Sequence, residues 1–370
     1  MIRLAAIIET FRDEFLARYG DRLSADQRRA LEAMVRCRSQ ASPKMLASCS
    51  ACAHQQLVPH SCGHRLCPHC QHHAGEQWLT RQSRARVPAG YFLLTFTLPS
   101  ELRPLARTRP RAVFDALMGC AWQTLRTFAR NDRQLRGTPG AVAVLHTHSR
   151  RLDFHPHVHL VMPAAAIDGA RRWRVKRGVK SGRGYLFSER ALAKVFRGRI
   201  LAALAAAGLR WPADAAPRWV VHCKAVGGGD KALRYLGRYL YRGVIREADI
   251  LECRDGQVTF RYRDANSGKS LRRTLPGAQF LWLILQHALP KGFRRARNYG
   301  FLHPNSKALI ALVQVLLADA PAQSLEMPAR PPLTCPCCGA VMVIVRTRIR
   351  ALAPYAQPPD PRALVGAVTV

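Results

Sequence analysis

Three histidines lie close together in one short segment, at His155, His157 and His159. The apolar residues Val158 and Leu160 alternate with them as in a β-strand, so His157 and His159 are expected to leave the strand on the same face. Two imidazoles that converge in this way are suited to hold a metal ion.

A second strand is predicted over residues 141–148, joined to the first by a hairpin through residues 149–154. This pairing would bring His146 or His148 beside the histidine pair. We expect His146 as the third metal ligand, with His155 as a weaker candidate because it precedes a proline at the strand edge. An all-histidine shell suits Mn²⁺ or Zn²⁺ better than Mg²⁺, but phosphate oxygens and water would complete the sphere and let Mg²⁺ serve, so Mg²⁺ or Mn²⁺ is expected.

Residues 230–242 are predicted to form a helix, with Asp230 as a plausible N-cap and Gly243 as a plausible stop. Tyr235 and Tyr239 are four residues apart and share a helix face, whereas Tyr241 lies off it. Such a pair is usually a packing feature, but neighbouring arginines favour phenolate and phosphate alike. These arginines are Arg234, Arg238 and Arg242. A histidine pair and a tyrosine pair are the parts required to break and rejoin DNA through a phosphotyrosine.

The net charge indicates the partner. The chain has 58 Lys and Arg against 23 Asp and Glu, a formal charge of +35, and a field of this sign attracts polyanions. We therefore expect a DNA-binding protein, with further contacts from Lys224 and from Arg174 and Lys176 in a basic loop. No signal peptide is recognised and the longest apolar run, 308–318, is too short to cross a bilayer, which predicts a cytoplasmic, nucleoid-associated bacterial protein without membrane contact.

Twelve cysteines in a reducing compartment indicate metal ligation rather than disulfides. Cys49-x2-Cys52 and Cys67-x2-Cys70 are separated by fourteen residues, a spacing that predicts one structural Zn²⁺ bound by all four thiolates. Other candidates lie between the pairs and could replace a cysteine or serve a second ion. They are Cys62, His54, His60 and His64.

A further Cys-x2-Cys pair, or knuckle, in the segment Cys335-Pro336-Cys337-Cys338 supplies only half of a metal site. No Cys or His follows it, so its other ligands would have to come from elsewhere in the fold or from another subunit. Whether Cys335 and Cys338 bind zinc stays open.

The pattern of apolar and polar residues along the chain predicts an α+β fold: a central antiparallel sheet with packed helices, and a small N-terminal module that is helical and binds zinc. The expected parts are N-terminal helices over 1–45, a zinc-binding domain over 46–86, a catalytic domain over 87–305, and a C-terminal helix and tail over 306–370. A phosphate-binding loop is not recognised, because the segment ending Ser267-Gly268-Lys269-Ser270 has Arg263 where the first glycine is required.

Together these motifs resemble rolling-circle transposases of the insertion-sequence 91 type, two-tyrosine members of the HUH endonuclease superfamily with an N-terminal zinc-binding domain. The matching pieces occur in family order between about residues 49 and 303. They are 61–70, 94–99, 145–147 with 155–159, 235–239, 289–293 and 299–301. Tyr241 departs from the pattern and is left out of the site.

The resemblance implies a metal-dependent tyrosine DNA nickase and strand transferase that acts on single-stranded, hairpin-bearing element ends through a 5′-phosphotyrosine. A homo-oligomer is compatible with it. Three alternatives are a plasmid replication initiator or relaxase, a catalytically dead zinc DNA-binding protein, and a metal-dependent phosphodiesterase that hydrolyses DNA without a covalent intermediate.

Overall fold

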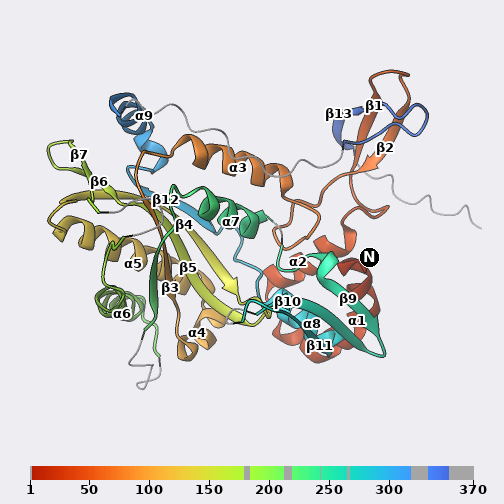
Figure 1. The fold of residues 1–370 in the computed structure, drawn as a ribbon. Helices are drawn as coiled ribbons and strands as arrows, with labels where there is room; N and C mark the ends of the chain where they lie inside the picture. Colours follow the sequence, from red (N-terminus) through yellow and green to blue (C-terminus); the bar gives the residue numbers. More distant parts are fainter. Residues whose placement is uncertain are drawn as a thin grey trace, which may run out of the picture.

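The structure is a computed structural model that describes residues 2–178, 184–211, 219–241, 243–264, 267–317 and 332–349. Its centre is a seven-stranded antiparallel sheet (Figure 1). Six strands follow the order β7 (Trp173–Val175), β6 (Ala165–Asp168), β4 (Gly137–His148), β5 (Phe154–Pro163), β3 (Tyr91–Thr97) and β8 (Val221–Ala225), and β12 (Ala296–Gly300) also pairs with β4. This confirms the predicted α+β class and central antiparallel sheet.

Alternation along β4 and β5 sorts their side chains onto two faces. Leu145, Val158 and Leu160 belong to a core on one face, together with the helices that cover it. Those helices are α4 (Arg103–Thr108), α5 (Pro110–Asn131) and α6 (Glu189–Ala206), with η2 (Ser100–Leu102) before them. The other face carries Val144 and Val161, and is covered by α3 (His72–Arg84), α7 (Asp230–Tyr241) and α9 (Lys307–Leu316), which follows η4 (Pro304–Ser306).

The N-terminal helices pack against a segment from much later in the chain. They share a core with residues 245–285, to which Phe15 and Phe280 contribute fully buried rings. This body contains α1 (Leu4–Tyr19), η1 (Gly20–Arg22), α2 (Ala25–Arg36), η3 (Glu247–Asp249), β9 (Ile250–Arg254), β10 (Gln257–Arg263), β11 (Ser270–Pro276) and α8 (Gly277–Leu285). Within it, β10 and β11 pair as an antiparallel hairpin.

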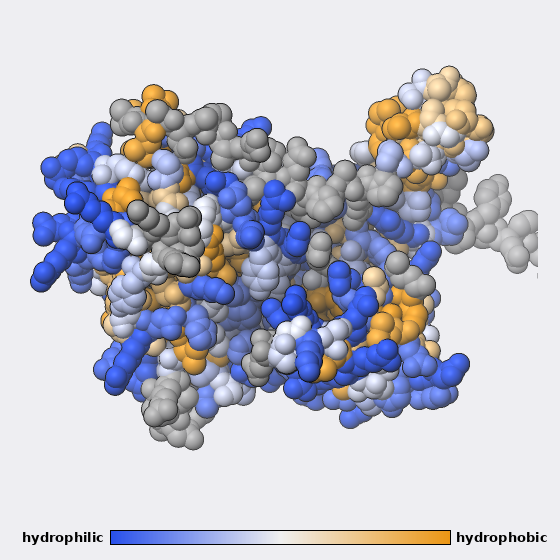
Figure 2. Space-filling model, viewed as in Figure 1, coloured by the Kyte–Doolittle hydropathy of each residue, from blue (hydrophilic) through white to orange (hydrophobic). Residues whose placement is uncertain are grey.

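A small sheet projects from the rest of the molecule (Figure 1). It has the order β13-β1-β2, formed by β13 (Met342–Ile349), β1 (Lys44–Cys49) and β2 (Gln55–Pro59). Residues from the two ends of the chain thus form one sheet. Its surface is apolar in patches, with Leu57, Val343 and Val345 all more than half exposed (Figure 2).

In the part of the chain that the structure describes, no helix is both long and apolar enough to span a membrane.

Candidate active site and metal centres

Three histidines meet on the α7 side of the sheet. His146 on β4 is directly opposite His157 on β5, and His159 lies one alternation further along the same face. The metal-binding atoms of the three side chains all lie within 4.8 Å of one another. The predicted convergence of His157 and His159 with an upstream histidine is therefore present, and the upstream partner is His146.

Hydrogen bonds orient two of the three rings. His159 Nδ1 is 2.8 Å from Thr95 Oγ1 on β3, and His157 Nδ1 is 2.7 Å from the carbonyl oxygen of His155. Both contacts leave Nε2 available, as is usual where a metal-bound histidine uses its second nitrogen for positioning. His146 Nε2 is buried without a hydrogen-bond partner among the described residues, an unsatisfied atom that a cation would satisfy. The residues present therefore fit a divalent metal ion.

Burial keeps these imidazoles uncharged. Desolvation lowers the pKa of His157 to about 4, and the pKa values of His146 and His159 also lie well below the usual range because of burial and of the neighbouring histidines. Neutral imidazole is the form that coordinates metal. The cluster is thus in its ligating form at neutral pH.

The two other candidate histidines are directed elsewhere. The pairing of β4 with β5 shifts register between His146 and His148, and this bulge takes His148 out of the cluster. The His148 ring stacks on that of Tyr239, with centroids 4.8 Å apart, and lies 5.0 Å from that of His287. His155 Nδ1 is 2.8 Å from a guanidinium nitrogen of Arg103. Neither belongs to the group of converging ligands.

Helix α7 presents both predicted tyrosines to the histidines. The Tyr235 ring centroid lies 5.8 Å from that of His146 and 5.7 Å from that of His159. Tyr239 stacks flat on His146, with centroids 3.2 Å apart and planes 6° apart. Its hydroxyl oxygen accepts a 3.0 Å hydrogen bond from the backbone N–H of Thr147. The side chains singled out from sequence thus form one constellation.

Arg295 is a part of this constellation that the sequence reasoning missed. Its guanidinium lies 4.5 Å from the centroid of the Tyr239 ring, and its Nε donates to the carbonyl oxygen of Leu145. It immediately precedes β12, and no motif distinguishes it from the many other arginines of the chain. Tyr241, as expected, lies away from the histidines and beside Trp78, with ring centroids 6.4 Å apart.

The predicted DNA-contacting residues differ in their surroundings. Arg234, Arg238 and Lys224 are exposed, and Arg242 lies outside the described residues. Arg174 and Lys176 form ion pairs, Arg174 with Asp168 at 2.9 Å and Lys176 with Asp132 at 2.5 Å. The Lys176 side chain is also largely buried, so its predicted contact with DNA finds no support in the geometry.

The predicted zinc site needs correction, because Cys49, Cys52, Cys67 and Cys70 do not form one site. Cys49 and Cys52 converge with Cys335 and Cys338, while Cys67 and Cys70 converge with Cys37 and Cys62. The half-site near the C-terminus therefore finds its missing ligands elsewhere in the fold, and Cys62 serves a second cluster. Cys37 was not considered from the sequence, because it is a single cysteine at the end of α2 without a knuckle pattern.

Sulfur separations in both clusters are suited to zinc. Cys49 Sγ to Cys338 Sγ and Cys37 Sγ to Cys70 Sγ are both 3.5 Å. Four sulfurs placed tetrahedrally ~2.3 Å from an ion are about 3.8 Å apart, whereas a disulfide would need ~2.05 Å. Backbone N–H groups of Cys52 and Ala51 lower the pKa of Cys49 to about 6, which favours the ligating thiolate.

Comparison with known proteins follows the same division of the chain. A family described as "Putative transposase" matches residues 140–308, and one described as "Transposase zinc-binding domain" matches residues 7–98. The putative transposase y4qJ of Sinorhizobium fredii is 32% identical over 81% of this chain and 80% of its own. The transposase for insertion sequence element IS801 of Pseudomonas savastanoi pv. phaseolicola is 30% identical over 79% of this chain and 76% of its own.

Among solved structures, the conjugative relaxase TrwC in complex with oriT DNA is 17% identical, with a TM-score of 0.25 over 60% of this chain and 71% of that chain. TrwC in complex with a mutant oriT DNA is 16% identical, with a TM-score of 0.23 over 60% of this chain and 70% of that chain. TM-scores of this size carry no argument. The sequence relatives and the two family matches show the family: the chain belongs to the insertion-sequence 91 type transposases with an N-terminal zinc-binding domain.

Proposed function

We propose that this transposase cleaves and rejoins single-stranded DNA at the ends of its element through a 5′-phosphotyrosine, in a rolling-circle type of transposition. The observation that carries the proposal is the placement of Tyr235 and Tyr239 against the cluster of His146, His157 and His159. A nucleophile beside a site suited to a divalent metal is the arrangement that phosphoryl transfer needs.

The three histidines would hold Mg²⁺ or Mn²⁺, which when bound supplies Lewis-acid polarisation of the scissile phosphate. Tyr239 is held by its stacking on His146 and by the Thr147 N–H. Tyr235 is 44% exposed and can meet incoming DNA. Arg295 and the exposed Arg234 and Arg238 place positive charge near the phosphodiester.

The reaction exchanges one P–O bond for another. A tyrosine oxygen bonds to phosphorus and loses its proton, while the P–O3′ bond breaks and the departing 3′-oxygen takes up a proton. Because a diester is converted into a diester, no nucleotide hydrolysis is needed. A free 3′-hydroxyl can then attack the phosphotyrosine in the reverse sense, and the second tyrosine remains available for the next strand.

Trapping the covalent adduct tests this proposal. The protein is incubated with Mg²⁺ or Mn²⁺ and a single strand bearing the element's own end, and the products are separated in denaturant. We expect a DNA adduct that survives denaturation, weaker strand transfer with Tyr235→Phe or Tyr239→Phe, and no adduct with the double variant.

Tyr241→Phe on the same helix is the matched control and should keep the adduct. Cleaved DNA without any adduct would favour the hydrolytic phosphodiesterase. An adduct that persists in the double variant, or disappears with Tyr241→Phe alone, would show that the nucleophiles are assigned wrongly.

Metal binding is tested separately by titrating Mn²⁺ into zinc-loaded protein. His146→Asn removes a ligand and should weaken binding at least about tenfold. His155→Asn changes a neighbouring histidine that is bonded to Arg103 instead, and should leave the affinity unchanged. Equal losses in the two variants would place the metal elsewhere.

A further inference from the structure

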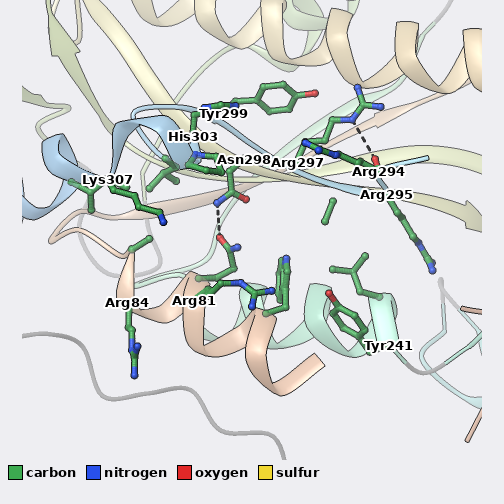
Figure 3. A pocket seen from close by; sticks show the side chains of 18 of the residues that line it. Arg81, Arg84, Tyr241, Arg294, Arg295, Arg297, Asn298, Tyr299, His303 and Lys307 are labelled. Carbon is green, nitrogen blue, oxygen red and sulfur yellow. Dashed lines mark hydrogen bonds between the residues drawn. The ribbon is translucent and has the colours of Figure 1, made fainter. Parts of the chain in front are cut away.

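A large cleft lies beside the candidate active site, at the C-terminal end of α7. Its volume is about 1080 Å³. Figure 3 shows Arg81, Arg84 and Tyr241 along one wall, facing the segment 294–303 on the other. The walls are formed by α3, the end of α7, β12 with its flanking residues, and the start of α9.

The cleft is strongly and almost purely basic. Seven cationic side chains line it, and no carboxylate of the described residues does. They are Arg65, Arg81, Arg84, Arg294, Arg295, Arg297 and Lys307. Among the described residues, only Arg297 of the seven forms an ion pair, with Asp115. Burial and the nearby Arg295 lower the pKa of Arg65, as expected where cations crowd together without a counter-charge. A polyanion would relieve this repulsion.

The cleft also offers surfaces for bases. Tyr241 lines it together with the largely buried Trp78, and the two ring centroids are 6.4 Å apart. Asn298 donates to Gln82 Oε1 at 3.1 Å and so joins the two walls. Positive charge interleaved with an aromatic face is the pattern by which proteins grip single-stranded nucleic acid, because charge tracks the phosphates and rings stack on unpaired bases.

Arg295 connects the cleft to the tyrosines. It lines the cleft, and the same guanidinium lies over the Tyr239 ring. Tyr239 in turn stacks on His146. A strand bound in the cleft would therefore be separated from the histidine cluster by the side chains of Arg295 and Tyr239.

We propose that this cleft binds a single strand of DNA, with its phosphates on the seven cations and a base against Tyr241. Seven cations are more than the phosphates of one free nucleotide can neutralise, which favours a stretch of polymer. The proposal rests on the proposed function only in taking this strand to continue into the active site.

The test measures binding without chemistry. Tyr235→Phe/Tyr239→Phe protein, zinc-loaded and without added Mg²⁺ or Mn²⁺, is titrated against a fluorescent single-stranded oligonucleotide of mixed sequence at several salt concentrations. Adding Arg81→Ala, Arg84→Ala and Lys307→Ala should raise Kd at least about tenfold. Each lost phosphate contact on a single strand removes ~0.7 from the slope of log K against log salt, so the slope should fall by about 2.

The matched control removes the same charge from the opposite face of the sheet, through Arg126→Ala, Arg130→Ala and Lys194→Ala on α5 and α6, all exposed. It should change Kd far less. If both triple variants weaken binding equally, the cleft contributes only through the overall positive charge of the protein, and the proposal is overturned. The proposal is also overturned if the cleft variant weakens the binding of duplex DNA as much as that of single-stranded DNA.

Stacking is tested by a pair of variants at one position. Tyr241→Ala should weaken binding at least about fivefold, while Tyr241→Phe keeps the ring and the affinity. A bromodeoxyuridine oligonucleotide should crosslink to Tyr241 under ultraviolet light, and crosslinks confined to other regions would contradict the assignment. Because none of these readouts needs cleavage, a failed adduct assay with intact cleft binding would remove the proposed function alone.

Discussion

Tyr235 and Tyr239 share a helix face but have different surroundings. Tyr239 is clamped between the His146 ring, the Arg295 guanidinium and the Thr147 N–H. Tyr235 is nearly half exposed, and partial burial together with the neighbouring Tyr239 raises its pKa. The pair is therefore one preorganised phenol and one that can move, which suits two successive strand events.

His287 makes stability depend on pH. It is fully buried, and burial lowers its pKa to about 3, whereas an unfolded histidine titrates near 6.5. Below pH 6.5 the unfolded chain binds a proton at this histidine, whereas the folded protein stays unprotonated there down to about pH 3. The contribution of His287 to the free energy of unfolding is therefore fully present above pH 6.5 and is lost as the pH falls toward 3. For this one group the loss between pH 7 and pH 5 is about 2 kcal/mol.

We therefore expect His287→Gln to lose less stability than the parent between pH 7 and pH 5, by about 2 kcal/mol, in denaturant unfolding of zinc-loaded protein. Other acid-sensitive groups are common to both proteins and cancel. Identical losses in the two would show that His287 takes up its proton without unfolding.

At the residue scale, strand alternation and helix spacing suffice to predict which side chains meet. His157 and His159 follow from a period of two, and Tyr235 with Tyr239 from a spacing of four. His148 could not be told from His146, because a bulge changes the register without any sequence mark. Arg295 and Thr95 reach the site through tertiary packing, which no local pattern encodes.

Helix α7 is held close to its neighbours by glycines. A Cβ at Gly237 would lie 3.1 Å from Leu79 Cδ1 on α3, so this position lets the two helices approach. Gly243 follows the helix with φ of +71°, and a Cβ there would meet the carbonyl oxygen of Leu66 at 2.8 Å. The end of the tyrosine helix thus rests on the loop that carries Cys67.

Gly243→Ala should destabilise the protein by about 1–3 kcal/mol, because it adds a backbone clash to the cost of a left-handed residue. Gly256→Ala is the matched control, with φ of +73° and open space around the missing Cβ. Thermal unfolding should show a larger drop for Gly243→Ala. Equal drops would mean that the contact with Leu66 relaxes freely.

The extent of α7 was nearly correct from sequence, and its surroundings were not. The helix includes Asp230 instead of being capped by it, and Asp230 pairs with Arg86. The three consecutive glycines at 227–229 form a turn in which the Gly227 carbonyl accepts from the Tyr91 N–H at 2.7 Å. Composition indicates the conformational freedom of glycine, but only packing decides whether that freedom remains.

At the scale of the whole molecule, the two cysteine clusters tie distant segments together. Cys49 and Cys338 are 289 residues apart; Cys49 ends β1, Cys338 precedes β13, and the two strands are paired. The spacing of the cysteine pairs predicted that zinc would bind, but three similar Cys-x2-Cys pairs and the single cysteines Cys37 and Cys62 can be combined in several ways. Which of them share an ion is decided by the fold, so the sequence alone led to the wrong grouping.

We expect two zinc ions per chain by elemental analysis of the purified protein. Cys335→Ser with Cys338→Ser should leave one, because the cluster of Cys37, Cys62, Cys67 and Cys70 remains intact. Cys337→Ser changes an exposed cysteine between them that belongs to neither cluster, and should keep both ions. One ion in the parent protein would refute the second site.

The joining of β1 to β13 also has a consequence for synthesis on the ribosome. At ~5–20 residues per second, Cys338 is added about 15–60 s after Cys49, and until then the first knuckle has only half of its ligands. A prematurely terminated product would never complete the β13-β1-β2 sheet and its cysteine cluster, and its unpaired strand edges would be exposed to proteases and to aggregation. Completion of this small sheet therefore distinguishes chains that were translated past β13 from truncated ones.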